Sequence, residues 1–387
     1  MRTVVHCAPG AAIRIPALFE GLGAKRVLLV SDKGLVQAGI VQQIQSVFEH
    51  NNLGKVKLAG VYTDILPDAS CSSVNDATEF ARSLAADSIL AIGGGSVLDA
   101  SKGIKYALHN GLTDIGDALQ TGIKIEAWPK QSAAGIPHIG VPTTAGTGAE
   151  ASAIAVFLNE EMNIKSNLVS PGLEPDMAVL DANLTVGLPA SITAATGMDA
   201  LTHAIEAIAS PASNCMTDAH AFMAAQLIME NLPLVVENGD DVIARSNMLQ
   251  ASTMAIDAFF GCLNAIPVHN CAHAFGAMFH IPHGDANAAL LPIVLDAMKD
   301  FYVGQGARLA KAVNCFSEGK SDDELLADAT FAIKKLTETI NTPTNFQKWG
   351  VSSEHRESIT TAIASDPAAM FLPLPPQAVN NIIDRVL

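Results

Sequence analysis

Apolar runs alternate with amphipathic helical patterns through the first half of the chain. The pattern predicts a buried strand over 25–32 and a helix over 35–52, and then a strand over 55–65 and a helix over 73–86. The stretch 87–110 holds a strand, a glycine turn and a helix in succession. Strands that alternate with helices in this way predict a parallel sheet covered by helices.

Further strand patterns complete this half. A loop-rich stretch runs through Pro129 and leads to a strand over 137–144. The runs AIAVFLN (153–159) and IKSNLVS (164–170), separated by the polar EEM, predict a hairpin. The stretch 177–189 closes the strand-rich half.

From Ala190 onward, long helical patterns rich in Ala and Met replace the strands, and a proline-rich connection, 367–381, precedes a last short helix. The change of pattern places the domain boundary near Leu188–Pro189. We therefore expect an α/β nucleotide-binding domain with a Rossmann-like parallel sheet over 1–188, followed by an all-helical domain over 189–387.

Composition excludes several classes of function. The 387 residues suffice for two domains, 49% of them are hydrophobic, and no apolar run is expected to span a bilayer. The N-terminus lacks the apolar core of a secretory signal, and six scattered cysteines without a CxxC motif favour reduced thiols in a cytoplasm. A net charge of −16 argues against nucleic acid as a partner. We expect a cytoplasmic protein that binds neither nucleic acid nor membrane.

The segment 267–285, PVHNCAHAFGAMFHIPHGD, holds four of the eleven histidines. His269 and His273 are four residues apart, so on a helix both imidazoles project from one face. That helix is expected to stop before Pro282, which leaves His283 in the loop that follows. The histidines could be ordinary core and surface residues, but imidazole is the commonest metal ligand, and the cluster favours a metal site.

A second helical pattern, GMDALTHAIE (197–206), places Asp199 and His203 four residues apart. Asp199 alone could be a first-turn residue favoured by the helix dipole. Two such pairs in one chain, however, indicate a metal ion held between two helices. One carboxylate with imidazoles and no thiolate suits Fe²⁺ or Zn²⁺.

A glycine turn, GGGSVLDASK (93–102), follows a predicted strand and opens a helix, which is the setting of a phosphate-binding turn. Gly94 and Gly95 allow backbone N–H groups to approach an anion, and Ser96 is expected to cap the helix. Asp99 could simply favour the first turn of that helix. The pattern is not GxGxxG, and glycine turns between strand and helix are common.

Threonines follow the next strand, in PTTAGTGAE (142–150). Thr143, Thr144 and Thr147 could contact phosphate or ribose oxygens, because ligands bind outside the carboxyl ends of strands in such sheets. The alternative is an ordinary Thr/Gly loop. Asp32 ends the first strand of the sheet, where a carboxylate can accept the ribose hydroxyls of NAD and repel the 2′-phosphate of NADP. It could instead cap the next helix.

These motifs, in this order and spacing, resemble the iron-containing (group III) alcohol dehydrogenase family over nearly the whole chain. The resemblance implies a dehydroquinate synthase-like architecture, with an NAD-binding α/β domain and a helical metal-binding catalytic domain. It also implies roles for particular residues. The metal ligands would be Asp199, His203, His269 and His283, with His273 as a further catalytic histidine near the reacting carbon, and Asp99, Lys165 and Leu184 beside the cofactor.

The chain departs from the family pattern where substrate would bind. The approach to the first histidine of the later segment reads CLNAIPVH (262–269), and Phe260 is expected to line the substrate side. Ile154 stands where relatives often carry a polar or aromatic residue, and Asp68 replaces an Asn near the adenosine end. These departures leave the chemistry alone but leave the substrate open.

The resemblance therefore implies a metal-dependent alcohol dehydrogenase or aldehyde reductase, using Fe²⁺ (with Zn²⁺ as the alternative) and NAD(H) in preference to NADP(H). The bound ion would act as a Lewis acid on the oxygen of a small alcohol or aldehyde. A homodimer or a higher homo-oligomer is expected. Two other interpretations stay open. One is an NAD- and zinc-dependent lyase resembling the dehydroquinate-synthase-like cyclases, and the other is a non-catalytic nucleotide-binding protein.

Overall fold

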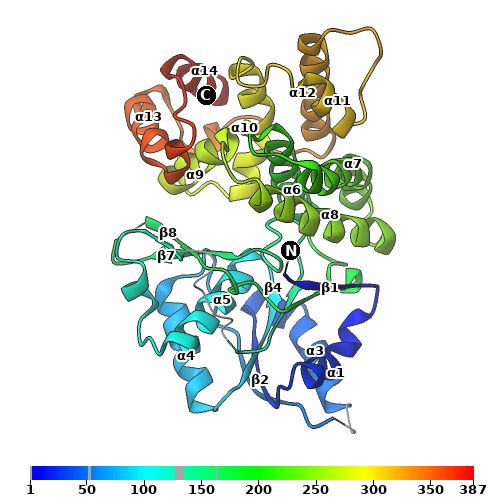
Figure 1. Ribbon diagram of the computed structural model, residues 1–387, viewed down its shortest axis with the longest axis vertical. Helices are drawn as coiled ribbons and strands as arrows, with labels where there is room; N and C mark the ends of the chain where they lie inside the picture. The colour runs from blue at the N-terminus through cyan, green and yellow to red at the C-terminus, as the bar shows by residue number, and fades with distance from the viewer. Residues whose placement is uncertain (1, 51–53, 127–134, 163) are drawn as a thin grey trace. The chain divides into compact units, whose positions relative to one another are not determined.

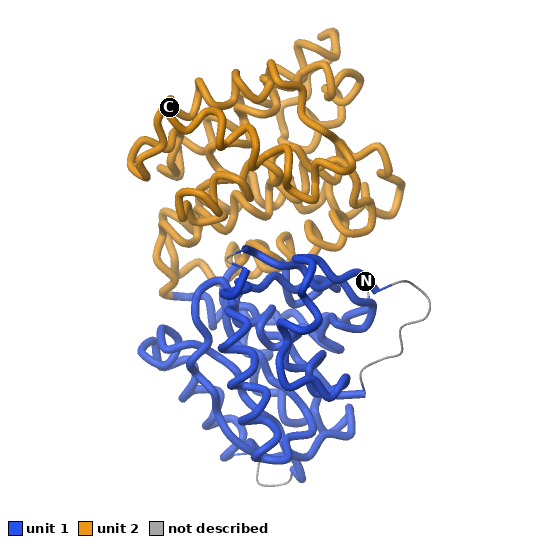
Figure 2. Tube along the Cα trace, turned by 90° about the vertical axis from the view of Figure 1, so that its left-hand side faces the viewer, with its two compact units in different colours: residues 1–144, 148–186 blue, residues 145–147, 187–387 orange. Residues whose placement is uncertain are grey.

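The computed structural model describes residues 2–50, 54–126, 135–162 and 164–387. The chain forms two compact units, coloured separately in Figure 2. Unit 1 comprises 1–144 and 148–186, and unit 2 comprises 145–147 and 187–387. The sequence pattern had assigned 145–147 to the first domain, whereas these three residues pack with the helices of unit 2. Gly146 explains this, because its carbonyl accepts a hydrogen bond from Ser252 Oγ at 3.0 Å.

Unit 1 is built on a six-stranded sheet in the order β1-β9-β6-β4-β2-β3, in which every pairing is parallel (Figure 1). The predicted parallel sheet is confirmed. The strands of this sheet are β1 (Val4–Cys7), β2 (Arg26–Val30), β3 (Lys57–Tyr62), β4 (Ser88–Gly93), β6 (His138–Pro142) and β9 (Met177–Leu180).

A smaller sheet in the same unit has the order β5-β8-β7. β7 (Ile154–Asn159) and β8 (Ile164–Val169) form the antiparallel hairpin that the sequence predicts. β5 (Ile123–Ile125) pairs parallel with β8 and lies inside the stretch predicted to be loop. Its three residues are too few to give an alternating pattern. The end of that predicted loop, including Pro129, lies outside the described residues.

Helices of unit 1 connect these strands. They are α1 (Ile15–Gly21), α2 (Lys33–Gln37), α3 (Ile40–Glu49), α4 (Cys71–Ser83) and α5 (Gly95–Asn110), with the 3-10 helices η1 (Ala11–Arg14), η2 (Ile115–Ala118) and η3 (Ala182–Leu184). The single helix predicted over 35–52 is wrong. Gly39, with φ 77°, separates α2 from α3, because its left-handed backbone cannot continue a helix.

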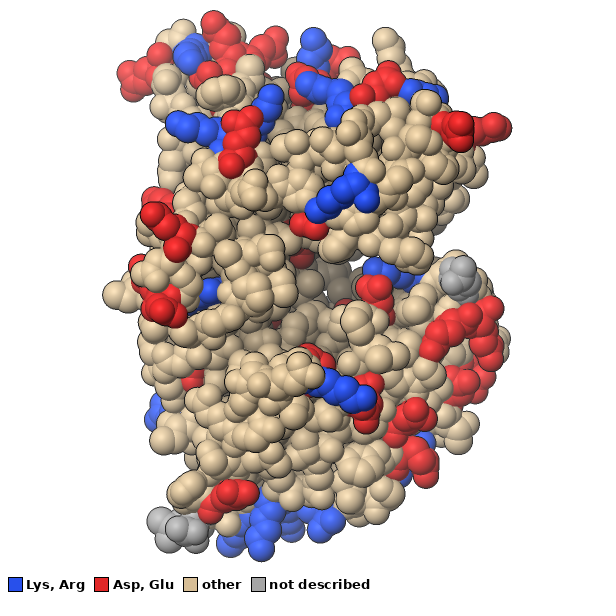
Figure 3. Space-filling model, turned by 180° about the vertical axis from the view of Figure 1, so that it is seen from behind, with Lys and Arg blue, Asp and Glu red and all other residues tan. Residues whose placement is uncertain are grey.

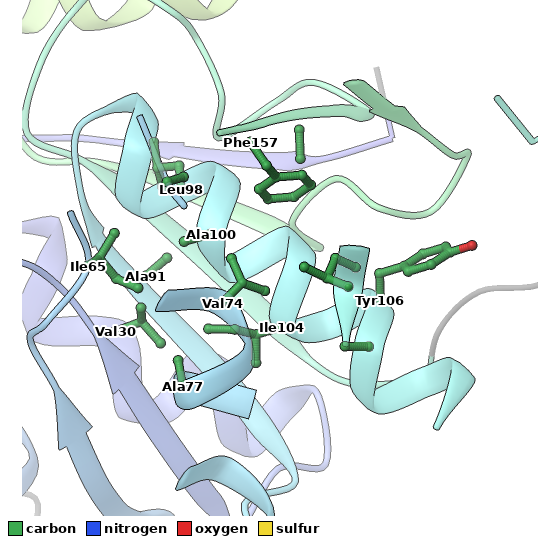
Figure 4. Packing of buried hydrophobic residues seen from close by; sticks show 14 of the residues in the cluster. Val30, Ile65, Val74, Ala77, Ala91, Leu98, Ala100, Ile104, Tyr106 and Phe157 are labelled. Atoms are coloured by element: carbon green, nitrogen blue, oxygen red, sulfur yellow. The ribbon is translucent and has the colours of Figure 1, made fainter. Parts of the chain in front are cut away.

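The core of unit 1 lies on both faces of the larger sheet. On β2, Leu28 belongs to the apolar cluster that includes α4 and α5, while Val27 and Leu29 belong to the cluster that includes α1 and α3. Figure 4 shows Val74 of α4 and Ile104 of α5 in the first of these clusters. A strand buried on both faces reads as a continuous apolar run, which is why KRVLLVSD could be recognised from sequence.

Unit 2 is helical throughout its described residues, as predicted. Its α-helices are α6 (Ala190–Ala209), α7 (Cys215–Glu237), α8 (Val242–Gly261), α9 (Pro267–Phe279), α10 (His283–Ala297), α11 (Gly306–Ala312), α12 (Asp322–Thr339), α13 (Arg356–Ser365) and α14 (Pro376–Val386). Its 3-10 helices are η4 (Gln347–Trp349), η5 (Ser353–His355) and η6 (Pro367–Met370). α6 packs against α7, α8, α9 and α10, and most of its residues are buried.

One helix within the described residues, α7, is long and apolar enough by length and composition to cross a membrane. Its most apolar window has a mean hydropathy of 1.3, and 39% of that window is buried. No such segment was expected from the sequence. α7 packs against both α6 and α8, and core helices of soluble proteins meet the same test, so the length of α7 is weak support for a membrane span.

Acidic side chains are spread over much of the face of the molecule that Figure 3 presents, with basic side chains in smaller groups. This distribution follows from a chain with 39 Asp and Glu against 23 Lys and Arg.

Candidate metal centre and cofactor-binding edge

Three helices of unit 2 bring the four predicted metal ligands together. α6 supplies Asp199 and His203, α9 supplies His269, and α10 begins at His283. One ligand atom from each of Asp199, His203 and His269 lies within 4.8 Å of the others, and all three residues are buried. His283 Nε2 lies 3.4 Å from Asp199 Oδ1. His283 was expected in a loop, but it is the first residue of α10, directly after the N-cap Pro282.

The donor set fits a divalent cation. His203 Nδ1 and His269 Nε2 are buried and have no hydrogen-bond partner in the described part of the chain. A buried imidazole nitrogen without a partner is costly, whereas coordination to a metal ion satisfies it. Cys271 lies in the same helix as His269, but burial raises the pKa of its thiol, so it does not supply a thiolate at neutral pH.

Burial and neighbouring charges set the protonation of these groups. Burial lowers the pKa of His203 to about 4, although the Asp199 carboxylate opposes this. Burial by itself would raise the pKa of Asp199, but the surrounding histidines hold it below its usual value. Burial also acts to lower the pKa of His269, yet Glu206 and Asp199 outweigh it and raise that pKa to about 9. His203 is therefore already in the neutral form that binds metal, whereas metal binding at His269 must displace a proton.

Two polar residues at this centre had not been predicted. Glu206 Oε2 lies 2.5 Å from His269 Nδ1, and Asn287 Nδ2 donates to Asp199 Oδ1 at 2.8 Å. Both residues are buried. Their spacing was available in the sequence, since Glu206 lies seven residues after Asp199 on one helix face and Asn287 four residues after His283. With Glu206 included, a divalent ion, the two carboxylates and neutral histidines would together carry no net charge.

His273 lies at the rim of this centre. Its side chain is 43% exposed, and its Nδ1 lies 3.1 Å from Asp366 Oδ2. Its ring stacks on that of His283, with the centroids 5.6 Å apart. Phe260, expected on the substrate side, packs edge-on against Phe259. Phe259 is the residue that contacts the ligands, because its ring centroid lies 4.8 Å from that of His203 and 5.1 Å from that of His269.

In unit 1, the predicted cofactor residues follow the carboxyl ends of three adjacent parallel strands. Asp32 follows β2, Gly94–Ser96 follow β4, and Thr143–Thr144 follow β6. The chain runs from β2 outward to β3 and then crosses to β4 on the other side of β2, so the topology switches between β2 and β4. A crevice at such a switch point is where open α/β sheets bind their ligands.

The glycine turn differs in one detail from the prediction. Gly94, and not Ser96, is the N-cap of α5, and no side chain caps this helix. A Cβ on Gly94 would lie 3.4 Å from Thr144 Oγ1, so the turn and the threonine loop pack closely. Ser96 Oγ instead accepts from the Asp68 N–H at 3.0 Å, and Asp68 Oδ1 pairs with Lys165 Nζ at 2.8 Å. Ser96 and Lys165 therefore both contact Asp68, Ser96 through the backbone N–H and Lys165 through the carboxylate.

Asp99 lies beyond the first turn of α5 and is engaged within the protein. Its Oδ1 pairs with Lys102 Nζ at 3.1 Å, and its Oδ2 accepts from the Val156 N–H at 3.1 Å. Burial raises the pKa of Asp99, against the effect of Lys102. The Ile154 carbonyl, on β7, accepts from the same lysine at 2.6 Å.

The three remaining residues predicted to bind the cofactor lie in different environments. Leu184 is buried in the core cluster that includes α1 and α3, so the structure shows a packing role for its side chain. Asp32 Oδ1 accepts from the Leu35 N–H at 3.0 Å and caps α2, which was the alternative for this residue. Thr147 belongs to the short segment that packs with unit 2.

Two family models match the chain. One, for iron-containing alcohol dehydrogenase, covers residues 3–182, and the other, for the C-terminal part of the Fe-containing alcohol dehydrogenase family, covers residues 193–385. The chain is 33% identical over 357 residues to long-chain-alcohol dehydrogenase 1 of Geobacillus thermodenitrificans, a match that spans 92% of this chain and 87% of that relative. These matches define an oxidoreductase of the alcohol dehydrogenase class. The protein belongs to the iron-containing alcohol dehydrogenase family.

Solved structures agree with this assignment. A 1,3-propanediol oxidoreductase has 31% identity and a TM-score of 0.86, with 99% of this chain and 98% of that chain covered. A sulfoacetaldehyde reductase from Bifidobacterium kashiwanohense, solved in complex with NAD⁺, has 28% identity and a TM-score of 0.85, with 100% and 97% covered. The expected architecture of an α/β unit followed by a helical unit is confirmed.

Proposed function

We propose that the protein is a metal-dependent NAD(H) alcohol dehydrogenase or aldehyde reductase that transfers hydride between a small primary alcohol, or its aldehyde, and nicotinamide. The observation that carries this proposal is the buried group of Asp199, His203 and His269, joined by His283, in which two imidazole nitrogens have no hydrogen-bond partner among the described residues.

The metal ligands in this proposal are Asp199, His203, His269 and His283. When bound, Fe²⁺, or Zn²⁺ as the alternative, supplies Lewis acidity toward the oxygen of the alcohol or aldehyde. His273 carries the alcohol proton toward solvent. Its exposure supports this role, and its contact with Asp366 fits a ring that donates from Nδ1 and accepts at Nε2.

Cofactor binding is proposed for the carboxyl edge of the larger sheet. The N-terminal N–H groups of α5, reached through Gly94 and Gly95, are suited to the pyrophosphate because no side chain caps this helix. Ser96 and the threonines Thr143, Thr144 and Thr147 supply hydroxyls to phosphate or ribose. Lys165 is proposed to bind the ribose. Asp99 is proposed to stabilise the glycine turn through its contacts with Lys102 and the Val156 N–H.

The substrate is a small alcohol or aldehyde, and relatives of this chain are named for different ones. Phe260 and Ile154 are proposed to contribute to this choice. A cytoplasmic homodimer or larger homo-oligomer completes the proposal.

Steady-state assays with NAD⁺, a reconstituted divalent metal and a panel of alcohols test this function. We expect alcohol-dependent formation of NADH that a chelator abolishes. A lyase of the cyclase type would instead consume its substrate without net reduction of NAD⁺, and that result would overturn the proposal.

The choice of metal gives a separate prediction. Zn²⁺ prefers four ligands, whereas Fe²⁺ accepts five or six. Four protein ligands therefore leave almost no free coordination position on Zn²⁺ but leave one or two on Fe²⁺ for the substrate oxygen. Apo-protein reconstituted anaerobically with Fe²⁺ should therefore turn over faster than protein reconstituted with Zn²⁺, although the affinity order favours zinc. Metal analysis paired with rates for each form checks this. An equal or faster zinc form with zinc bound at the four residues contradicts it.

Asp32 gives a prediction for cofactor choice. If its carboxylate repels the 2′-phosphate, Asp32→Gly should shift preference toward NADP by roughly 10- to 100-fold, since a like-charge clash costs a few kcal/mol. The lost cap of α2 should cost only about a few tenths of a kcal/mol, because glycine is itself an accepted N-cap. Asp32→Asn is the matched variant that keeps the cap and removes the charge. The ratio of kcat/KM for the two cofactors should shift in both variants. If neither variant changes this ratio, the Asp32 carboxylate does not lie near the ribose.

A further inference from the structure

Glu206 joins two of the helices that carry the metal ligands. It lies on α6, one turn beyond His203, and its side chain is fully buried. Oε1 accepts from the Val268 N–H at 2.6 Å, and Oε2 lies 2.5 Å from His269 Nδ1. Both partners belong to the first turn of α9, so one carboxylate receives two donors from the start of that helix.

The contact with His269 determines which ring nitrogen is available for metal. A carboxylate accepts hydrogen bonds, so the proton of the neutral ring lies on Nδ1, which leaves the lone pair on Nε2. His269 Nε2 is the atom that lies 3.6 Å from Asp199 Oδ1 and has no hydrogen-bond partner in the described chain. In the neutral ring, the nitrogen that Glu206 leaves without a proton is therefore the one that faces the other ligands.

The contact with Val268 fixes the helix that carries His269. The first N–H groups of a helix have no partner within it, and a carboxylate there is also favoured by the helix dipole. α9 has no side-chain cap from its own N-cap residue, Ile266, so Glu206 satisfies one of these groups from a different helix. A rotation of the His269 ring or a shift of α9 would break at least one of the two contacts.

We propose that Glu206 is a positioning residue of the metal centre, which sets the tautomer and the orientation of His269 and so increases metal affinity. This inference rests on the proposed metal-binding function of Asp199, His203, His269 and His283. Partners that orient metal-bound histidines typically change metal affinity or activity by about 10- to 100-fold when they are removed. Asn287, which donates to Asp199 Oδ1, supports a second ligand in the same way.

The test compares Glu206→Gln and Glu206→Asp with the wild-type protein. In a Gln amide an NH₂ group replaces one of the two carboxylate oxygens, so either the Val268 N–H or the His269 Nδ1–H would meet a donor where it now meets an acceptor. Zn²⁺ affinity is measured by competition with a chelator and should fall by about 10- to 100-fold in Glu206→Gln. It should fall by less in Glu206→Asp, because Asp keeps the negative charge on a shorter side chain. The visible spectrum of the Co²⁺ form should change in Glu206→Gln, since it reports the geometry of the ligands.

Glu174→Gln is the matched control, because Glu174 is also a buried glutamate but lies in unit 1. It should keep the wild-type Zn²⁺ affinity and Co²⁺ spectrum. Unchanged Zn²⁺ affinity and Co²⁺ spectrum in a folded Glu206→Gln protein overturn the role of Glu206 alone. Absence of stoichiometric metal from the wild-type site overturns the proposed function instead.

If neither Glu206 variant folds, the wild-type protein still decides the question. Nitrogen-15 NMR of histidine-labelled, Zn²⁺-loaded protein distinguishes the two tautomers of His269. Coordination through Nε2 with the proton on Nδ1 is expected, and coordination through Nδ1 contradicts the inference.

Discussion

His203→Ala is expected to remove the metal ion and the dehydrogenase activity together. His203 supplies one of the three most buried ligands, and its ring packs against those of Phe259 and His269. Loss of a ligand should reduce activity by more than about 100-fold, the upper range for residues that only support a ligand. Metal content, measured on the purified protein, and kcat/KM with NAD⁺ and an alcohol give the readout, while NAD⁺ binding to unit 1 should persist.

His220→Ala serves as the control for this result. His220 lies in the same unit, on α7, its side chain is partly exposed, and its described partner is Asp257, whose carboxylate lies 2.7 Å from Nδ1, and not a predicted ligand. This variant should retain metal and most of the activity. A His203→Ala protein that holds stoichiometric metal, or a His220→Ala protein that loses it, contradicts the ligand assignment.

Lys102→Met is expected to reduce the stability of unit 1 by about 3–5 kcal/mol, the usual cost of removing one partner of a buried ion pair. Lys102 is fully buried, and its Nζ donates to Asp99 Oδ1, Ser152 Oγ at 3.0 Å and the Ile154 carbonyl. These bonds tie α5, which begins at the glycine turn, to β7. The variant should therefore show a lower urea midpoint by circular dichroism and weaker NAD⁺ binding.

The pH dependence of this effect has a definite sign. Burial already raises the pKa of Asp99 while Lys102 opposes this, so removal of the lysine should raise it further. A carboxyl whose pKa is raised on folding destabilises the protein above that pKa, and the penalty is relieved as the pH falls through it. The loss of stability should thus be smaller in mildly acidic buffer than at neutral pH.

A double variant, Asp99→Asn with Lys102→Met, separates the buried charge from the lost packing. The Asn oxygen can still accept from the Val156 N–H, and no unpaired charge is left behind. Part of the lost stability should return. If the double variant is less stable than Lys102→Met alone, the penalty does not come from the Asp99 charge.

The sequence was sufficient where a local pattern decides the structure. The alternation of strands and helices predicted the parallel sheet, and the spacing of Asp199 with His203 placed two side chains on one face of α6. α9 begins at Pro267, and proline is common at the first position of a helix, where a missing N–H costs nothing. Each of these depends on residues a few positions apart, so no knowledge of the tertiary structure was needed.

Tertiary contacts account for what could not be predicted. Glu206 is 62 and 63 residues away from its partners Val268 and His269, and no local pattern links them. Ser96 was expected to cap α5, but its hydroxyl is occupied by the N–H of Asp68, from a separate loop. The ring that packs against His203 and His269 is that of Phe259, which was not predicted, because adjacent residues on a helix differ by a rotation of about 100°, finer than the pattern defines.

Because α6, α9 and α10 each supply part of one metal site, an ion bound there would join segments of the chain as distant as Asp199 and His283. Such an ion binds the folded helical unit and not the unfolded chain, so it shifts the folding equilibrium by mass action. The gain reaches about 2.7 kcal/mol when free metal is at a hundred times its dissociation constant. The abundance of intact protein in a cell would then follow the supply of metal, and a starved culture would lose the protein to proteolysis as well as to inactivity.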